Sequence, residues 1–268
     1  MKVRKSLAAR LYRGTANLVE PLIPAGLRTP AHHLSRRLTR RLEAEYGTIM
    51  GMASPGVTVV DVGANIGVFT YGFLGRGANV VAIEPQPGCA AQVRAFYEAG
   101  LPRVERRGSL DLRVEALGNE SGSAILYVPL RNGRADDESA SLAEGDGEAI
   151  RIEVPVRRLD DYGLDNVKVI KMDVEGRELP ALEGASATIR RWRPAILVEI
   201  EQRHHVEPIA GVFAQINSII GPRYTTSFLG TSNQMRPLSE FDVERDQLAL
   251  RDNPLSSAYV RNFFFLPR

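Results

Sequence analysis

Cysteine is almost absent from this 268-residue chain, which contains one, Cys89. A single cysteine cannot form an internal disulfide, so the chain lacks the disulfide framework that stabilises many small secreted domains. With 4 histidines beside it, the sequence offers no cysteine–histidine cluster with the spacing of a zinc site. These shortages favour a reducing compartment and exclude a metal centre built on cysteine.

Long hydrophobic runs are also missing. No stretch of about 18 apolar residues occurs, so no membrane-spanning helix is expected. The N-terminus is basic but lacks the apolar core of a signal peptide, so we expect a cytoplasmic protein. The formal net charge of +2 gives no case for a nucleic-acid partner. A hydrophobic content of 44% fits a globular chain with one sizeable core.

The stretch 57–73 predicts a strand, a tight turn and a helix. Four valines between positions 57 and 62 form a β-branched run, which is typical of a strand buried on both faces of a parallel sheet. Gly63 and Gly67 interrupt the run, and apolar residues then recur at helical spacing. The dinucleotide-binding pattern G-x-G-x-x-G is not present, which disfavours a nicotinamide-dependent oxidoreductase.

The turn reads D-x-G-x-N-x-G and resembles the nucleoside-binding turn of class I methyltransferases. This resemblance implies that Asp61, Gly63, Asn65 and Gly67 hold the methionine end and the ribose of S-adenosylmethionine. The open alternative is a tight connection from strand to helix, with Asp61 solvated beside it.

A second acidic residue ends the next strand. The run 79–83 is apolar and is followed by Glu84 and Pro85. In a doubly wound sheet, an acid about 20 residues past the glycine turn can accept hydrogen bonds from ribose hydroxyls. Glu84 is therefore the ribose candidate, and Pro85 is grouped with it in the cofactor site.

The middle of the chain predicts further strands and one long loop. A third strand is expected over 112–117, and its end would border the adenine in a class I sheet, which makes Ala116 and Leu117 lining candidates. The runs 123–129 and 150–156 predict an added antiparallel hairpin. Between them, 131–149 is poor in apolar residues and is either a lid over the acceptor, with Ser139 and Ser141 as contacts, or a solvated loop.

The second half alternates strands and helices again. We expect strands over 167–173 and 195–200, a helix from Glu178 to about 193, and a helix over 208–220. The runs 224–229 and 259–266 predict a terminal antiparallel pair.

Residues 1–50 differ from the rest in their excess of arginine and lysine over acids. Leucines at helical spacing predict a basic amphipathic helix, followed by a second helix from about Pro30 to Tyr46. Two interpretations remain open: residues 1–41 make peripheral contact with an anionic membrane surface, or they form a helical cap on the protein.

Several blocks together resemble the FkbM-type methyltransferase family. They are V-D-V-G-A-N-I-G (60–67), A-I-E-P (82–85), E-A-L-G-N-E-S-G (115–122), R-L-D-D-Y with V-I-K-M-D-V-E-G-R-E-L-P-A-L-E-G-A (158–185) and R-P-A-I-L-V-E-I (193–200). The resemblance implies a Rossmann-like class I fold with a mostly parallel seven-stranded sheet, an added β-hairpin and an N-terminal helical extension. It divides the chain into a basic extension, 1–50, and a methyltransferase domain, 51–268.

The same resemblance implies O-methylation that depends on S-adenosylmethionine. The acceptor would be a hydroxyl of a sugar, a glycan, a glycolipid or another natural product. The open alternative is a noncatalytic binding or scaffold protein that retains the fold.

Methyl transfer to a hydroxyl requires alignment and removal of the acceptor proton. Asp173 ends the predicted strand 167–173 and is the candidate for positioning the acceptor and taking its proton. Glu175, Glu199 and His204 lie close to the ends of adjacent strands and complete the catalytic set. The acids could share a proton or a divalent cation with the acceptor, but loop carboxylates are common without metal, so no metal ligand is assigned.

Overall fold

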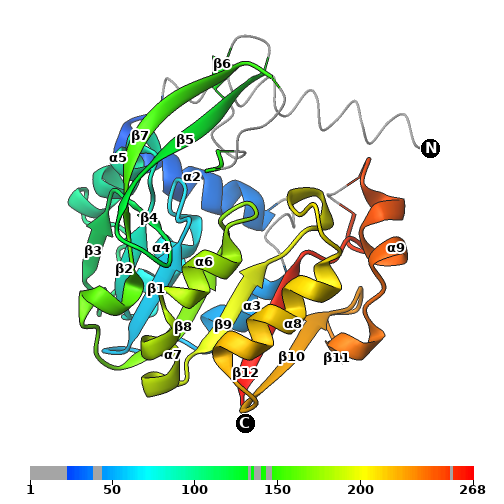
Figure 1. Cartoon of the computed structure of the whole chain (residues 1–268). Helices are drawn as coiled ribbons and strands as arrows, with labels where there is room; N and C mark the ends of the chain where they lie inside the picture. Colours follow the sequence, from blue (N-terminus) through cyan, green and yellow to red (C-terminus); the bar gives the residue numbers. More distant parts are fainter. Residues whose placement is uncertain (1–22, 39–43, 132–133, 136–139, 143–146, 254–255) are drawn as a thin grey trace.

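The computed structural model describes residues 23–38, 44–131, 134–135, 140–142, 147–253 and 256–268. A central eight-stranded sheet lies between two layers of helices, and a second sheet arches beyond it, at the top of Figure 1. The first predicted helix, within residues 1–22, lies outside the described residues, as do Ser139 and much of the predicted loop 131–149.

Five neighbouring strands of the central sheet run parallel, in the order β3–β2–β1–β8–β9. Their bounds are β1 (Thr58–Val62), β2 (Asn79–Ile83), β3 (Leu110–Arg113), β8 (Val167–Met172) and β9 (Ala195–Glu199). The order reverses between β1 and β8, and open sheets bind ligands beyond the carboxyl ends of strands at such a point. The predicted mixed α/β fold with a mostly parallel sheet is confirmed.

Three strands complete the other side of the sheet. β12 (Asn262–Pro267) runs antiparallel to both of its neighbours, β9 and β10 (Tyr224–Leu229). The predicted pairing of the last two long strands is therefore confirmed. The short β11 (Met235–Pro237) adds an edge strand, so the sheet has eight strands where seven were expected.

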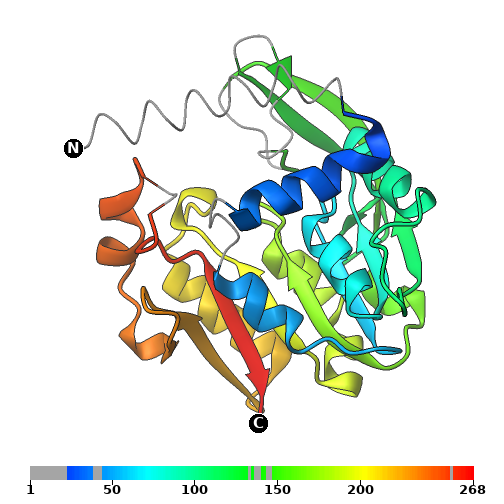
Figure 2. The same cartoon turned by 180° about the vertical axis from the view of Figure 1, so that it is seen from behind.

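Helices cover both faces because the strands alternate apolar side chains between them. Figure 1 shows α6 (Glu178–Glu183), α7 (Ser186–Trp192) and α8 (Ile209–Ile220) on one face. Figure 2 shows α2 (Ala25–Leu38), α3 (Ala44–Met50) and α4 (Val68–Gly75) on the other, where α5 (Pro87–Glu98) also packs.

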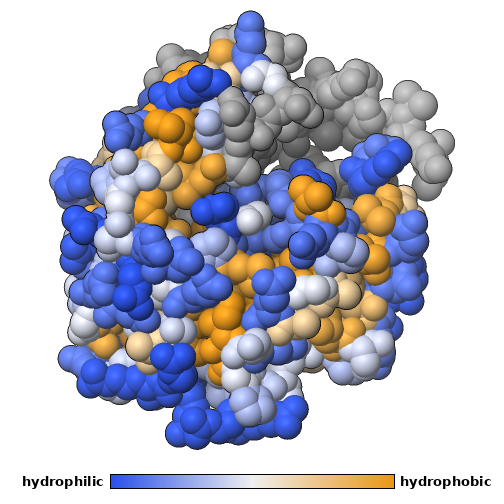
Figure 3. Space-filling view, in the orientation of Figure 1, coloured by the Kyte–Doolittle hydropathy of each residue, from blue (hydrophilic) through white to orange (hydrophobic). Residues whose placement is uncertain are grey.

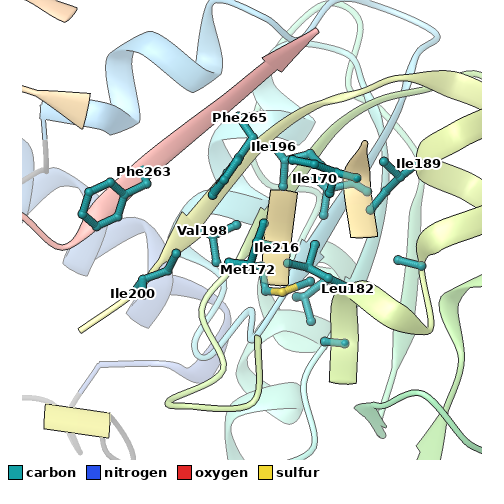
Figure 4. Packing of buried hydrophobic residues seen from close by; sticks show 14 of the residues in the cluster. Ile170, Met172, Leu182, Ile189, Ile196, Val198, Ile200, Ile216, Phe263 and Phe265 are labelled. Carbon is teal, nitrogen blue, oxygen red and sulfur yellow. The ribbon is translucent and has the colours of Figure 1, made fainter. Parts of the chain in front are cut away.

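The alternation is visible residue by residue. In β8, Ile170 and Met172 pack toward α6–α8, whereas Val169 joins the cluster on the opposite face. In β12, Phe263 and Phe265 face α6–α8. Figure 4 shows the first of these clusters, which includes Ile170, Met172, Leu182, Ile189, Ile196, Val198, Ile200, Ile216, Phe263 and Phe265.

The second sheet contains the predicted hairpin. β5 (Gly122–Arg131) pairs antiparallel with β7 (Ala149–Arg157), flanked by β4 (Ala116–Leu117) and β6 (Arg134–Ala135). Apolar surface gathers over the hairpin at the upper left of Figure 3. Ile125 of β5 and Ile150 of β7 are exposed. The third strand was predicted too long: β3 ends at Arg113, because Ala116 and Leu117 pair with β7 instead.

Two helix predictions also need correction. The helix expected from Glu178 to about 193 is two helices, α6 and α7, separated at Gly184 and Ala185. A Cβ at Gly184 would lie 2.0 Å from the carbonyl oxygen of Gly118, so this close approach requires glycine at the junction.

The N-terminal helices pack on the domain. α2 begins at Ala25 rather than near Pro30, and Gly26 lies against Ala95 of α5 and Ala99, which follows that helix. Thr29 is fully buried, and its hydroxyl donates to the carbonyl of Ile66 at 2.5 Å. The helix predicted over 30–46 is thus replaced by α2 and α3. Among the described residues, no helix has the length and hydropathy of a membrane span.

Asp160 explains part of the R-L-D-D-Y block. Its carboxylate accepts from the backbone N–H groups of Ala187 and Thr188 and from the Thr188 hydroxyl, at 2.8–3.0 Å. These contacts satisfy the free donors at the start of α7.

We expect Asp160→Ala to lower the free energy of unfolding by about 1–2 kcal/mol, because the first turn of α7 loses its acceptor. Asp165→Ala is the control, since the Asp165 side chain is 78% exposed and pairs with an exposed arginine. Urea unfolding measures both. Equal effects of the two substitutions would contradict the capping role.

Candidate active site at the carboxyl edge of the sheet

The turn after β1 has three residues in the left-handed region: Gly63 (φ 69°), Asn65 (φ 50°) and Gly67 (φ 83°). A Cβ at Gly63 would lie 1.8 Å from the carbonyl oxygen of Asp173, so only glycine fits there. The N–H of Gly63 donates to the Ile83 carbonyl at 2.9 Å. The turn therefore touches the ends of both neighbouring strands, β2 and β8.

Glu84 is tied to this turn directly. Its carboxylate accepts from the N–H of Asn65 at 2.7 Å and from the N–H of Gln86 at 2.8 Å. The residue is 6% exposed, and burial raises the pKa of Glu84 to about 7, although these hydrogen bonds and nearby Lys171 oppose the rise. Glu84 is thus close to half-ionised at neutral pH.

Asp61 lies beneath the turn rather than beside it. It is fully buried; one oxygen accepts from the Thr70 hydroxyl at 2.6 Å, and the other lies 3.7 Å from the Lys171 ammonium. The Lys171 ammonium also donates to the Gly63 carbonyl at 3.0 Å and lies 3.6 Å from the Asp173 carboxylate. One buried cation therefore joins β1, the turn and the end of β8.

Asp173 is the most accessible of these groups, with a side chain 33% exposed. Its N–H donates to the Val62 carbonyl at 3.1 Å, which holds it against the end of β1. Asp173, Glu175 and Glu199 each offer an oxygen within 4.8 Å of the others, a spacing that one cation could bridge. The structure thus brings together three of the four predicted catalytic residues.

His204, the fourth, pairs with one of these acids. Its Nε2 lies 2.5 Å from the Glu175 carboxylate. Burial lowers the pKa of His204, but Glu175 outweighs burial, so the pKa of the imidazole is raised above its ordinary value. The Arg261 guanidinium forms an ion pair with the Glu199 carboxylate at 3.6 Å. With Lys171 beside Asp173, each of the three clustered acids therefore lies near a basic side chain.

Ala116 and Leu117 pack in different apolar clusters. Ala116 belongs to the small apolar cluster under the hairpin, and Leu117 belongs to the core on the α6–α8 side. The residue before them, Glu115, accepts a hydrogen bond from the Tyr162 hydroxyl. Pro85 is partly buried and directly follows Glu84.

Sequence reasoning assigned no site role to Lys171, to Thr29 or to the segment before β12. Lys171 is buried in β8 whereas Lys168 is exposed, and a buried charge must be paired. Ser141, predicted as an acceptor contact, donates its hydroxyl hydrogen to the Glu175 carbonyl at 3.0 Å.

Several known methyltransferases are similar to this chain. "2-O-methyltransferase NoeI" of Sinorhizobium fredii is 26% identical over 173 residues, which cover 59% of this chain and 69% of that protein. "Methyltransferase sdnD" of Sordaria araneosa is 27% identical over 177 residues, with coverages of 51% and 67%. The crystal structure of methyltransferase FkbM from Methylobacillus flagellatus aligns with 20% identity and a TM-score of 0.48.

That alignment covers 91% of this chain but 55% of the crystallised one, so the chain spans about half of that protein's length. A family model, the methyltransferase FkbM domain, matches residues 61–225, from the last part of β1 into β10. Because this match covers more than half of the sequence, the chain belongs to the methyltransferase FkbM domain family.

Proposed function

We propose that this protein transfers the methyl group of S-adenosylmethionine to a hydroxyl of a sugar, glycan or related natural product. One observation carries the proposal: the glycine turn contacts both Glu84 and Asp173 at the edge where open sheets bind ligands. A cofactor over the turn would reach Glu84 on one side and Asp173 on the other.

The cofactor site would be formed as follows. Gly63, Asn65 and Gly67 allow close approach of the ligand to the backbone, and Glu84 accepts the ribose hydroxyls. Asp61 supports the turn from below through Thr70 and Lys171, so its contribution to the methionine end is indirect. The adenine would lie along Pro85, Ala116 and Leu117.

S-adenosylmethionine supplies the electrophilic methyl group when it is bound. Methyl transfer to a hydroxyl would require this chain to align the acceptor oxygen and to remove its proton. We assign the proton to the Asp173 carboxylate, which is held in place by its backbone bond to Val62 and by Lys171. We assign no proton transfer to His204, because its Nε2 is already paired with the Glu175 carboxylate at 2.5 Å.

No metal is assigned to the reaction. The His204 imidazole and the Arg261 guanidinium already lie beside the Glu175 and Glu199 carboxylates, so these acids do not require a metal ion as a partner.

The N-terminal extension, 1–50, is proposed as a cap on the domain, 51–268. The Thr29 hydroxyl donates to the carbonyl of Ile66, which lies within the glycine turn. We also propose, from the sequence, peripheral membrane contact by residues 1–41 and a cytoplasmic location.

Glu84 predicts a pH dependence of cofactor affinity. Ribose hydroxyls donate to the carboxylate and lower its pKa, so binding releases a proton near pH 7. The affinity for S-adenosylhomocysteine is therefore highest above pH 7 and falls as the pH drops, by up to about tenfold per unit. Calorimetry from pH 5.5 to 8.5 measures this, and the dependence is expected to vanish in Glu84→Gln. An equal slope in both proteins would remove Glu84 from the ribose site.

Asp173→Asn tests the catalytic assignment. We expect it to bind S-adenosylhomocysteine within about threefold of the unaltered protein but to lower kcat by about 10²–10⁴-fold, the usual contribution of a general base. Transfer of a tritiated methyl group to neutral glycans is the assay.

Asp165→Asn, at the other end of β8, is the matched control and should retain full activity. Full activity of Asp173→Asn would refute the assignment, and EDTA is expected to have no effect on transfer. Failure of the unaltered protein to bind S-adenosylhomocysteine would favour the noncatalytic alternative.

A further inference from the structure

The segment just before β12, residues 256–261, reaches the candidate site because of the sheet topology. β12 runs antiparallel to β9, with Asn262 opposite Glu199. The residues that precede β12 therefore lie beside those that follow β9, at the carboxyl edge of the parallel strands. This segment is outside the residues 61–225 that match the family model.

A buried glutamine fixes the segment in place. Gln247 is 1% exposed, and its amide nitrogen donates to the carbonyls of Ile200 and Val260 at 2.9 and 2.8 Å. Its oxygen accepts from the N–H of Gln202 at 2.8 Å, and the N–H of Ile200 donates to the Arg261 carbonyl at 2.8 Å. These hydrogen bonds hold the loop after β9 and the segment before β12 together.

Arg261 brings a guanidinium beside Glu199, an acid of the cluster that contains the proposed base. Its Nε lies 3.6 Å from a Glu199 oxygen, and the two side chains are 24% and 15% exposed. Glu199 in turn lies in the cluster with Asp173 and Glu175, whose oxygens are within 4.8 Å of one another. A ligand that contacts Asp173 is therefore within reach of both members of this pair.

Cations at this edge pair with acids, which bears on the charge of the acceptor. The pairs are Lys171 with Asp173 at 3.6 Å, His204 with Glu175 at 2.5 Å, Arg261 with Glu199 at 3.6 Å and Arg203 with Glu201 at 2.6 Å. Lys171 is also shared with the buried Asp61, at 3.7 Å, so the described part of the site has no excess of positive charge for a phosphate or carboxylate. This charge distribution favours an uncharged polar acceptor.

We propose that Arg261 and Glu199 form a subsite for adjacent hydroxyls of a neutral sugar, next to the hydroxyl that receives the methyl group. The inference rests on the proposed function and specifies its substrate class. A hydroxyl both donates and accepts, so one partner can accept from the planar guanidinium while its neighbour donates to the carboxylate. Arg261 is here a specificity-determining residue, and Asp173 keeps its separate role.

The experiment uses the full chain, tritiated S-adenosylmethionine and an array of neutral glycans. A glycan that accepts methyl is then compared with deoxy analogues that lack the hydroxyl next to the methylated one. We expect the deoxy analogue to react about 10–100-fold more slowly, because the Arg261–Glu199 pair loses a partner.

Arg261→Gln should lower kcat/KM for the intact glycan by a similar factor and nearly abolish the discrimination, while affinity for S-adenosylhomocysteine stays within about twofold. Arg261→Lys keeps the positive charge but loses the planar guanidinium with its paired N–H donors, and it should restore only part of the discrimination. Arg236→Gln is the control, since Arg236 pairs with Glu240 at 2.8 Å away from the site.

Unchanged discrimination in Arg261→Gln, or equal effects of Arg261→Gln and Arg236→Gln, would overturn the inference. So would the absence of transfer to any glycan with adjacent hydroxyls. If S-adenosylhomocysteine still binds in that case, the methyltransferase proposal stands and only the substrate class fails. If it does not bind, both proposals fail.

Discussion

The contact of the Lys171 ammonium with the turn after β1 is the interaction on which the rest of the site depends. Its Nζ donates to the Gly63 carbonyl at 3.0 Å and lies 3.7 and 3.6 Å from the carboxylates of Asp61 and Asp173. Removing such charges from water is costly unless they are paired, so the lysine and the buried Asp61 constrain each other. The pairing keeps the glycine turn and Asp173 side by side before any ligand binds.

Local signals were sufficient for most of the scaffold. The alternation of Val59 and Val60 between the two faces follows from strand geometry, and Gly63 fits a turn that no other residue could adopt. The hairpin of β5 and β7 followed from two alternating runs with turn residues between them. The site acids were also predictable as a group, because the ends of parallel strands meet at one edge.

Contacts between distant segments were not predictable. The break at Gly184 arises from its approach to Gly118, and the sequence around Glu178 and 193 carries no sign of it. Strand periodicity indicated where β12 lies in the sequence, but not that its insertion beside β9 would bring Arg261 to Glu199. The sequence shows a lysine at position 171, but it does not show which groups contact the ammonium, because these contacts depend on the pairing of β8 with β1.

A crystal structure of the protein with S-adenosylhomocysteine tests most directly whether Glu84 binds the ribose and Asp173 faces the transferred methyl group. We expect ribose hydroxyls at about 3 Å from the Glu84 carboxylate, the usual hydrogen-bond distance, with the sulfur atom on the Asp173 side of the turn. A ligand bound with its ribose away from Glu84, or with its sulfur facing away from Asp173, would contradict this expectation.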